Sequence, residues 1–174
     1  MPIEPDTKDW TWVLSRPCPD CAFDAARATP GRLPGLLQAN AAGWREVLAG
    51  DDAAVRPADN IWSPLEYACH VRDVHRLFAA RVRLMLEQVD PTFANWDQDE
   101  TAVSARYDEQ PADAVLVDLL TAADAAAAAY GAVPDDAWQR TGRRSDGSVF
   151  TVDTLGRYHL HDVVHHLWDV GGTG

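Results

Sequence analysis

One long helix, predicted over residues 62–89, limits the possible folds of this chain more than any other stretch. The segment reads WSPLEYACHVRDVHRLFAARVRLMLEQV, in which Ser63 suits an N-cap, Pro64 suits the first helical position and Glu66 completes a capping box. Pro91 stops the helix after about 27 residues, or about 40 Å at 1.5 Å per residue. A helix of that length in a chain of 174 residues predicts a helical bundle.

Three further helices are predicted from apolar spacing and end signals. Residues 35–49 carry apolar positions at helical intervals, and residues 111–133 form an alanine-rich helix opened by a proline. The last helix runs from a cap at Thr151 to about Val170, before two glycines. The prediction is therefore an all-α four-helix bundle in one domain, residues 1–174.

The remaining segments connect these helices. Residues 1–34 contain several prolines and are predicted to be irregular, and residues 92–110 form a long polar crossover between the second and third helices, with room for a helical turn. Residues 140–150 are turn-rich, and a short extended pair is expected around Asp146–Gly147.

Net charge excludes some classes of partner. The chain carries a formal charge of −12, which opposes binding to nucleic acid or to an anionic membrane surface and leaves small molecules as the expected partners. There is no uninterrupted apolar run of about 18 residues and no signal-like N-terminus, so a cytoplasmic location is expected. A disulfide would be unusual in that compartment.

Four histidines gather in the last helix, in the sequence GRYHLHDVVHHLWDV. At about 100° per residue they cannot share one face. Two pairs have the i,i+4 spacing by which one helix offers two ligands to one ion. His161 and His165 fall on the predicted outer face, whereas Asp162 and His166 border the predicted core, as does His159. Both pairs stay candidates, and the second is favoured by its position.

A third ligand must come from another helix. The two remaining histidines, His70 and His75, both lie on the long second helix. They are offset by about 140° and so cannot reach the same ion. His70 lies about two turns from the helix start, beside the predicted buried face, and is the better candidate.

The motif CPDC, Cys18 to Cys21, is a weaker candidate site. A C-x-x-C pair can be redox-active or half of a zinc site. It does not neighbour a β-α-β pattern, and Cys69, the only other cysteine, stands alone on the long helix. The expectation is therefore that no second half-site exists and that the pair is structural or incidental.

Two stretches resemble the DinB-like metalloprotein superfamily, which includes mycothiol-dependent isomerases and bacillithiol transferases. WSPLEYACH is similar to that family's helix start ending at the first ligand, here His70, and DVVHHLWDV is similar to its last helix, with Asp162 and His166 as ligands. The mycothiol-dependent branch usually has glutamate at the position of Asp162, so the pair His161 and His165 stays an alternative.

The resemblance implies an up-up-down-down bundle, a homodimer, and a divalent ion (zinc, nickel or manganese) held by three side chains. It further implies a thiol transferase or isomerase that uses a low-molecular-weight thiol such as mycothiol on a small electrophile. A metal-dependent hydrolase and a non-catalytic protein that binds metal or a small ligand are the alternatives. Asp169 and Asp73 are candidates to orient the histidine ligands. Arg143 and Arg144 are candidates to hold a carboxylate, or else solvated loop charges.

Overall fold

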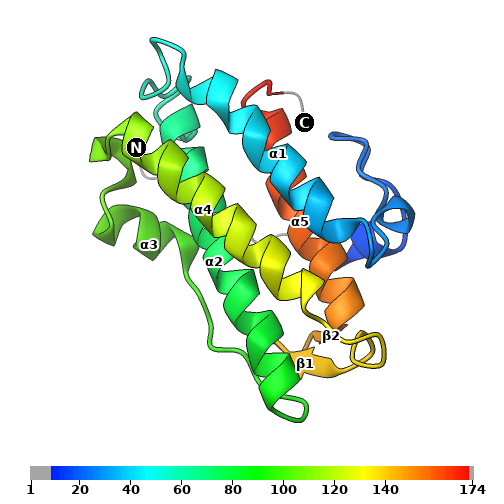
Figure 1. Ribbon diagram of the computed structural model, residues 1–174. Coiled ribbons are helices and arrows are strands. Elements are labelled where there is room, and N and C mark those ends of the chain that lie inside the picture. The colour runs from blue at the N-terminus through cyan, green and yellow to red at the C-terminus, as the bar shows by residue number, and fades with distance from the viewer. Residues whose placement is uncertain (1–8, 173–174) are drawn as a thin grey trace.

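The computed structural model describes residues 9–172 and is mostly helical (Figure 1). Five α-helices, three short 3-10 helices and one two-stranded sheet follow one another along the chain. In order they are η1 (Thr11–Leu14), η2 (Ala25–Arg27), α1 (Leu33–Leu48), α2 (Pro64–Glu87), α3 (Gln98–Ser104), η3 (Tyr107–Glu109), α4 (Ala112–Gly131), β1 (Thr141–Arg143), β2 (Val149–Thr151) and α5 (Val152–Asp169). The bundle consists of α1, α2, α4 and α5, as the sequence predicted. No helix among residues 9–172 is long and apolar enough to cross a membrane.

The direction of the helices differs from the expected up-up-down-down order. In the bundle α4 and α5 each pack against both α1 and α2 (Figure 1). The Gln38 amide in the first half of α1 donates to Asp124 in the second half of α4 over 2.8 Å, and Gly131 at the end of α4 lies beside Pro34 at the start of α1, so these two helices are antiparallel. His70, early in α2, lies beside Asp162 of α5, whereas Phe78, later in α2, stacks on Tyr158, which precedes Asp162, so these two helices are also antiparallel.

The order is therefore up-down-down-up. The long crossover follows from this order, because α2 and α4 are parallel and the chain must return along the bundle between them. Residues 49–63 form turns rather than an extended return, so α2 starts at the end where α1 finishes. The direction of α2 relative to α1 depends on this tertiary arrangement, and no local signal in the sequence encodes it.

The capping signals that predicted α2 and α5 are present. The hydroxyl of Ser63 accepts from the backbone N–H of Glu66, whose carboxylate accepts in return from the N–H of Ser63. Thr151 and Thr154 form the same reciprocal arrangement at the start of α5. These caps satisfy backbone donors that a helix start otherwise leaves unpaired, and they fix where each helix begins.

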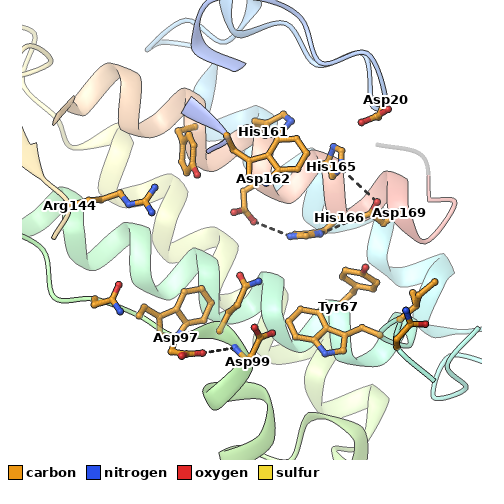
Figure 2. Close-up of a pocket in the computed structure, with 18 residues that line it drawn as sticks. Asp20, Tyr67, Asp97, Asp99, Arg144, His161, Asp162, His165, His166 and Asp169 are labelled. Carbon is orange, nitrogen blue, oxygen red and sulfur yellow. Dashed lines mark hydrogen bonds and ion pairs between the residues drawn. The ribbon is translucent and has the colours of Figure 1, made fainter. Parts of the chain in front are cut away.

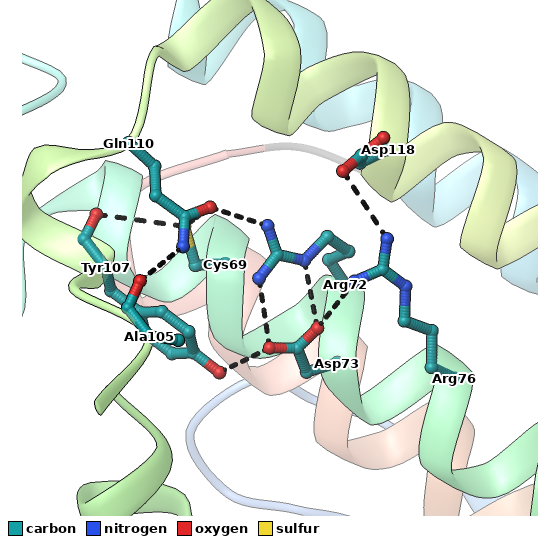
Figure 3. Close-up of polar contacts among 8 residues, drawn as sticks. All are labelled: Cys69, Arg72, Asp73, Arg76, Ala105, Tyr107, Gln110 and Asp118. Carbon is teal, nitrogen blue, oxygen red and sulfur yellow. Dashed lines mark hydrogen bonds and ion pairs between the residues drawn. The ribbon is translucent and has the colours of Figure 1, made fainter. Parts of the chain in front are cut away.

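A polar network fastens the crossover to α2 (Figure 3). Asp73 accepts from the Arg72 guanidinium at 2.9 and 3.0 Å and from the Tyr107 hydroxyl at 2.6 Å. Arg72 also donates to Gln110 at 2.7 Å. Burial alone would raise the pKa of Asp73, but Arg72 and Tyr107 lower it below its ordinary value. Asp73 therefore holds the crossover in place, and the suggestion that it orients His70 was wrong.

The segment before α1 covers one face of α5. The rings of Trp10 and Phe23 lie 5.5 and 5.4 Å from the ring of His161, and the Arg157 guanidinium donates to the Ala25 carbonyl over 2.6 Å. His161 is in consequence only 4% exposed. The expectation that the His161 side of the last helix faces solvent was wrong, because a helical wheel cannot include a covering segment from elsewhere in the chain.

Candidate metal centre

Three side chains from two helices converge at one end of the bundle. His70 comes from the second turn of α2, and Asp162 and His166 come from successive turns of α5. Asp162 Oδ1 lies 3.7 Å from His70 Nε2 and 3.6 Å from His166 Nε2. One donor atom from each of the three residues lies within 4.8 Å of the other two. The structure thus brings together the three residues favoured as metal ligands.

The geometry and the unsatisfied atoms fit a divalent ion. Two ligand atoms that each bind a tetrahedral ion at about 2.1 Å lie about 3.4 Å apart, close to the separations at Asp162. Within residues 9–172, both ring nitrogens of His70 and the Oδ1 atom of Asp162 are buried without a hydrogen-bond partner. A buried polar atom without a partner costs roughly 1–3 kcal/mol. Coordination of an ion would satisfy His70 Nε2 and Asp162 Oδ1 together.

Aromatic rings hold His70 in place. The imidazole is 1% exposed, and the Trp96 ring from the crossover stacks on it with centroids 5.4 Å apart. The Trp62 ring, directly before the α2 cap, lies 5.3 Å away at a tilt. Burial lowers the pKa of His70 below its ordinary value of 6.5, so the ring is neutral near pH 7. The neutral imidazole is the form that binds a metal.

The two candidate ligands on α5, Asp162 and His166, are each stabilised by neighbouring charged or polar side chains. Burial alone would raise the pKa of Asp162, yet His70 and His166 overcome it and hold that carboxyl ionised. His166 directs Nε2 toward Asp162, while its Nδ1 lies 3.0 Å from Asp169 Oδ2. A carboxylate behind a histidine ligand fixes the ring orientation and raises its basicity. Asp169 therefore has the orienting position expected for it.

Asp162 and His166 border a polar pocket of about 580 Å³, whereas His70 does not line it but contacts the rings of Trp62 and Trp96, which do. In Figure 2, Asp162 and His166 point toward one another from α5, and Arg144 lies on the opposite side of the pocket from Asp169. Among the described residues that line the pocket, Arg144 is the only arginine or lysine. Arg143 does not line the pocket and pairs with Asp90 at 2.8 Å, whereas Arg144 lines it while pairing with Asp146 at 3.0 Å. Of the two candidate arginines, Arg144 is therefore the one that can meet a bound molecule.

Two further buried histidines lie away from this centre: His159, which was expected to border the core, and His75. His75 and His159 are both 0% exposed, and the Nδ1 of His75 lies 3.0 Å from the Nε2 of His159. The Nδ1 of His159 also meets the Tyr130 hydroxyl at 3.3 Å. Burial lowers the pKa of His75 to about 4 and that of His159 well below 6.5. These rings form a neutral hydrogen-bonded chain in the core, and His159 does not share the face of Asp162.

A second group of potential ligands lies on the adjacent face of α5. Cys18, Cys21, His161 and His165 each place one donor atom within 4.8 Å of the other three. The expectation that CPDC lacks a second half-site was therefore wrong. The missing half is HDVVH, which the sequence analysis weighed only as an alternative to the first centre. The signal that could have found it is the pairing of a C-x-x-C with an H-x-x-x-H.

Comparisons with known proteins agree with the observed fold. The family model described as the DinB superfamily matches residues 36–170, more than half of the chain. Among solved structures, YfiT from Bacillus subtilis is similar, with a TM-score of 0.71, 17% identity, and coverage of 82% of this chain and 85% of that chain. YfiT is described as a probable metal-dependent hydrolase with an unusual four-helix bundle topology. No curated protein matches the sequence. Because the family model matches more than half of its length, this chain belongs to the DinB superfamily.

Proposed function

We propose that this protein is a metal-dependent enzyme that transfers or isomerises a small electrophilic substrate with the help of a low-molecular-weight thiol of the mycothiol type. The observation that carries the proposal is the meeting of His70 with Asp162 and His166, two residues that line a pocket of about 580 Å³. Three protein ligands leave coordination positions for another molecule, which is characteristic of catalytic rather than structural sites. Zinc, nickel and manganese all suit two imidazoles and one carboxylate.

The side chains of the first centre would have two roles, metal binding and orientation of a ligand. His70, Asp162 and His166 would hold the ion, and Asp169 would keep His166 in the orientation that presents Nε2. A bound divalent ion supplies charge that lowers the pKa of a thiol or a water beside it. In a transfer, the thiol would release its proton to solvent, and its thiolate would form a bond to an electrophilic carbon while the bond from that carbon to its leaving group breaks and the leaving group departs with the electron pair.

The rest of the pocket suits a polar molecule larger than water. Arg144 can form a paired hydrogen bond with a carboxylate of the thiol or of the substrate. Tyr158 also lines the pocket, and burial raises the pKa of its hydroxyl to about 12, so the phenol stays protonated and can donate. An acidic chain needs such a local cation if it is to accept an anionic group.

A metal-dependent hydrolase is the second candidate, and it is favoured by the description of YfiT. The same three ligands would serve, and water would take the place of the thiol. A non-catalytic protein that binds metal or a small ligand is the third candidate. The homodimer implied by the family resemblance stays a proposal, which sedimentation of the purified protein would test.

One experiment separates these candidates. Protein loaded in turn with zinc, nickel or manganese is mixed with monochlorobimane in the presence of mycothiol, glutathione or no thiol, and in parallel with p-nitrophenyl acetate alone. The proposal predicts thiol transfer that depends on the kind of thiol and is lost in His70→Ala. Ester hydrolysis without thiol, also lost in His70→Ala, would favour the hydrolase. The absence of both activities from protein with full metal occupancy would contradict an enzymatic role.

A further inference from the structure

We propose that Cys18, Cys21, His161 and His165 form a second metal site, distinct from the first, which binds a zinc-type ion and fastens the N-terminal segment to α5. The four residues come from two segments far apart in the sequence, a C-x-x-C turn and an i,i+4 pair on α5. Two thiolates and two imidazoles are a common ligand set of structural zinc sites. This inference does not depend on the proposed enzymatic function.

The spacing of the donor atoms fits tetrahedral coordination. Zinc binds sulfur at about 2.3 Å and nitrogen at about 2.05 Å, so a sulfur and a nitrogen on one tetrahedral ion lie about 3.6 Å apart. Cys18 Sγ lies 3.7 Å from His165 Nδ1. All four donor atoms lie within 4.8 Å of one another.

Burial and charge favour an ion over an incidental cluster. Cys18 is 1% exposed and His161 is 4% exposed, and within residues 9–172 the Nε2 atom of His161 is buried without a hydrogen-bond partner. On binding a divalent cation the two thiols would release two protons to solvent, and the resulting thiolates would balance the charge of the ion. A neutral assembly suits this buried position, where an uncompensated charge would be costly.

The backbone around the ligands is already arranged for both halves of the site. The N–H of Cys18 donates to the Phe23 carbonyl over 2.8 Å, which closes a turn that directs both cysteines toward α5. Because four protein ligands would complete the coordination, this site would be closed and structural, whereas the first is open. An ion here would fix the segment that carries Trp10 and Asp20 into the pocket wall.

Asp169 lies behind both groups of ligands. Its Oδ2 atom lies 3.0 Å from His166 Nδ1 in the first centre, and its Oδ1 atom lies 3.8 Å from His165 Nε2 in the second. His165 thus directs Nδ1 to Cys18 and Nε2 toward a carboxylate, the orientation that histidine ligands of metals usually have. The two sites would share one outer carboxylate.

The test measures the metal content and the cobalt spectrum of untagged full-length protein purified under reducing conditions. Elemental analysis is expected to find about two zinc ions per chain in the wild type, and about one in each of Cys18→Ser/Cys21→Ser and His70→Ala. In cobalt-loaded protein, thiolate-to-metal charge-transfer absorption is expected in the wild type and in His70→Ala. It should be absent from the double serine variant. Cys69→Ser, which replaces a buried cysteine outside both groups, is the matched control and should resemble the wild type.

The spectra keep this inference separate from the first centre, because His70, Asp162 and His166 contain no sulfur. Loss of the first centre alone would leave the charge-transfer band intact. A wild-type protein without that band after cobalt loading would overturn the second site, as would a Cys18–Cys21 disulfide found by mass spectrometry in the metal-loaded protein. If the double serine variant fails to fold, the wild type and His70→Ala still decide, since both retain the cysteines.

Discussion

Removal of the Asp169 carboxylate is expected to weaken metal binding at the first centre without unfolding the bundle. Asp169 Oδ2 lies 3.0 Å from His166 Nδ1, on the side of the ring away from Asp162. Loss of such an outer carboxylate typically costs 10–100-fold in metal affinity, or about 1.4–2.7 kcal/mol. The Asp169 side chain is 23% exposed, so solvent screens part of the interaction. The lower part of that range, about 10–30-fold, is therefore expected for Asp169→Ala.

The size of the effect should depend on charge as well as on hydrogen bonding. Asp169→Asn keeps an oxygen that can accept from His166, and a neutral hydrogen bond is worth roughly half of one to a charged group. Its loss of affinity should accordingly be about half that of Asp169→Ala on a free-energy scale. Asp153→Ala is the matched control, because Asp153 lies on the same helix with a 19% exposed side chain and pairs with Arg157 instead. It should leave affinity unchanged.

Zinc affinity is best measured by competition with a chromophoric chelator in a Cys18→Ser/Cys21→Ser background. That background leaves only the first centre to titrate and does no harm if the second site does not exist. Circular dichroism of each metal-free variant checks that the bundle is folded. An affinity for Asp169→Ala within twofold of its background would refute the orienting role of Asp169.

Three further predictions concern the pocket, the core and the helix packing. Arg144→Ala should raise KM for a carboxylate-bearing substrate about tenfold with kcat nearly unchanged, whereas Arg143→Ala should not; equal effects in steady-state assays would contradict the assignment. Because burial lowers the pKa of His75 from 6.5 to about 4, stability should be lost as pH falls below about 6.5, by about 2 kcal/mol from pH 7 to pH 5. In urea unfolding, His75→Gln should remove this pH-dependent part of the free energy of unfolding. The same dependence of stability on pH in the variant as in the wild type would contradict the assignment to His75. Gly156→Ala would drive a Cβ into a buried leucine of α1 and should lower the free energy of unfolding by about 1–3 kcal/mol. Gly35→Ala, where a Cβ would meet nothing within 4 Å, should cause no loss of stability in thermal unfolding. Equal melting temperatures for the two variants would contradict the close packing at Gly156.

Local signals in the sequence predicted the elements of the fold well. Ser63 with Glu66, and Thr151, marked helix starts because capping depends on residues three positions apart. The hairpin around Asp146–Gly147 was also predicted, since Gly147 supplies the positive φ that its turn requires. Helix direction was not predictable in this way, because it depends on which faces pack together.

The same distinction applies to the two groups of potential ligands: local helix geometry predicted the first group, and the second depends on contacts between distant segments. Helical periodicity favoured Asp162 and His166, because both the wheel and the structure depend on the geometry of one helix. The same wheel assigned His161 and His165 to solvent, although residues before α1 cover them. A contact between segments more than a hundred residues apart cannot be read from the spacing within either one, and only the pairing of the C-x-x-C with the H-x-x-x-H could have suggested it.

Anomalous diffraction at the zinc edge, from crystals of the zinc-loaded protein, tests the central claim most directly. The account predicts a peak within about 2.0–2.2 Å of His70 Nε2, an Asp162 carboxylate oxygen and His166 Nε2. A zinc-loaded crystal with no peak among these three side chains, or with ordered water in its place, would contradict it.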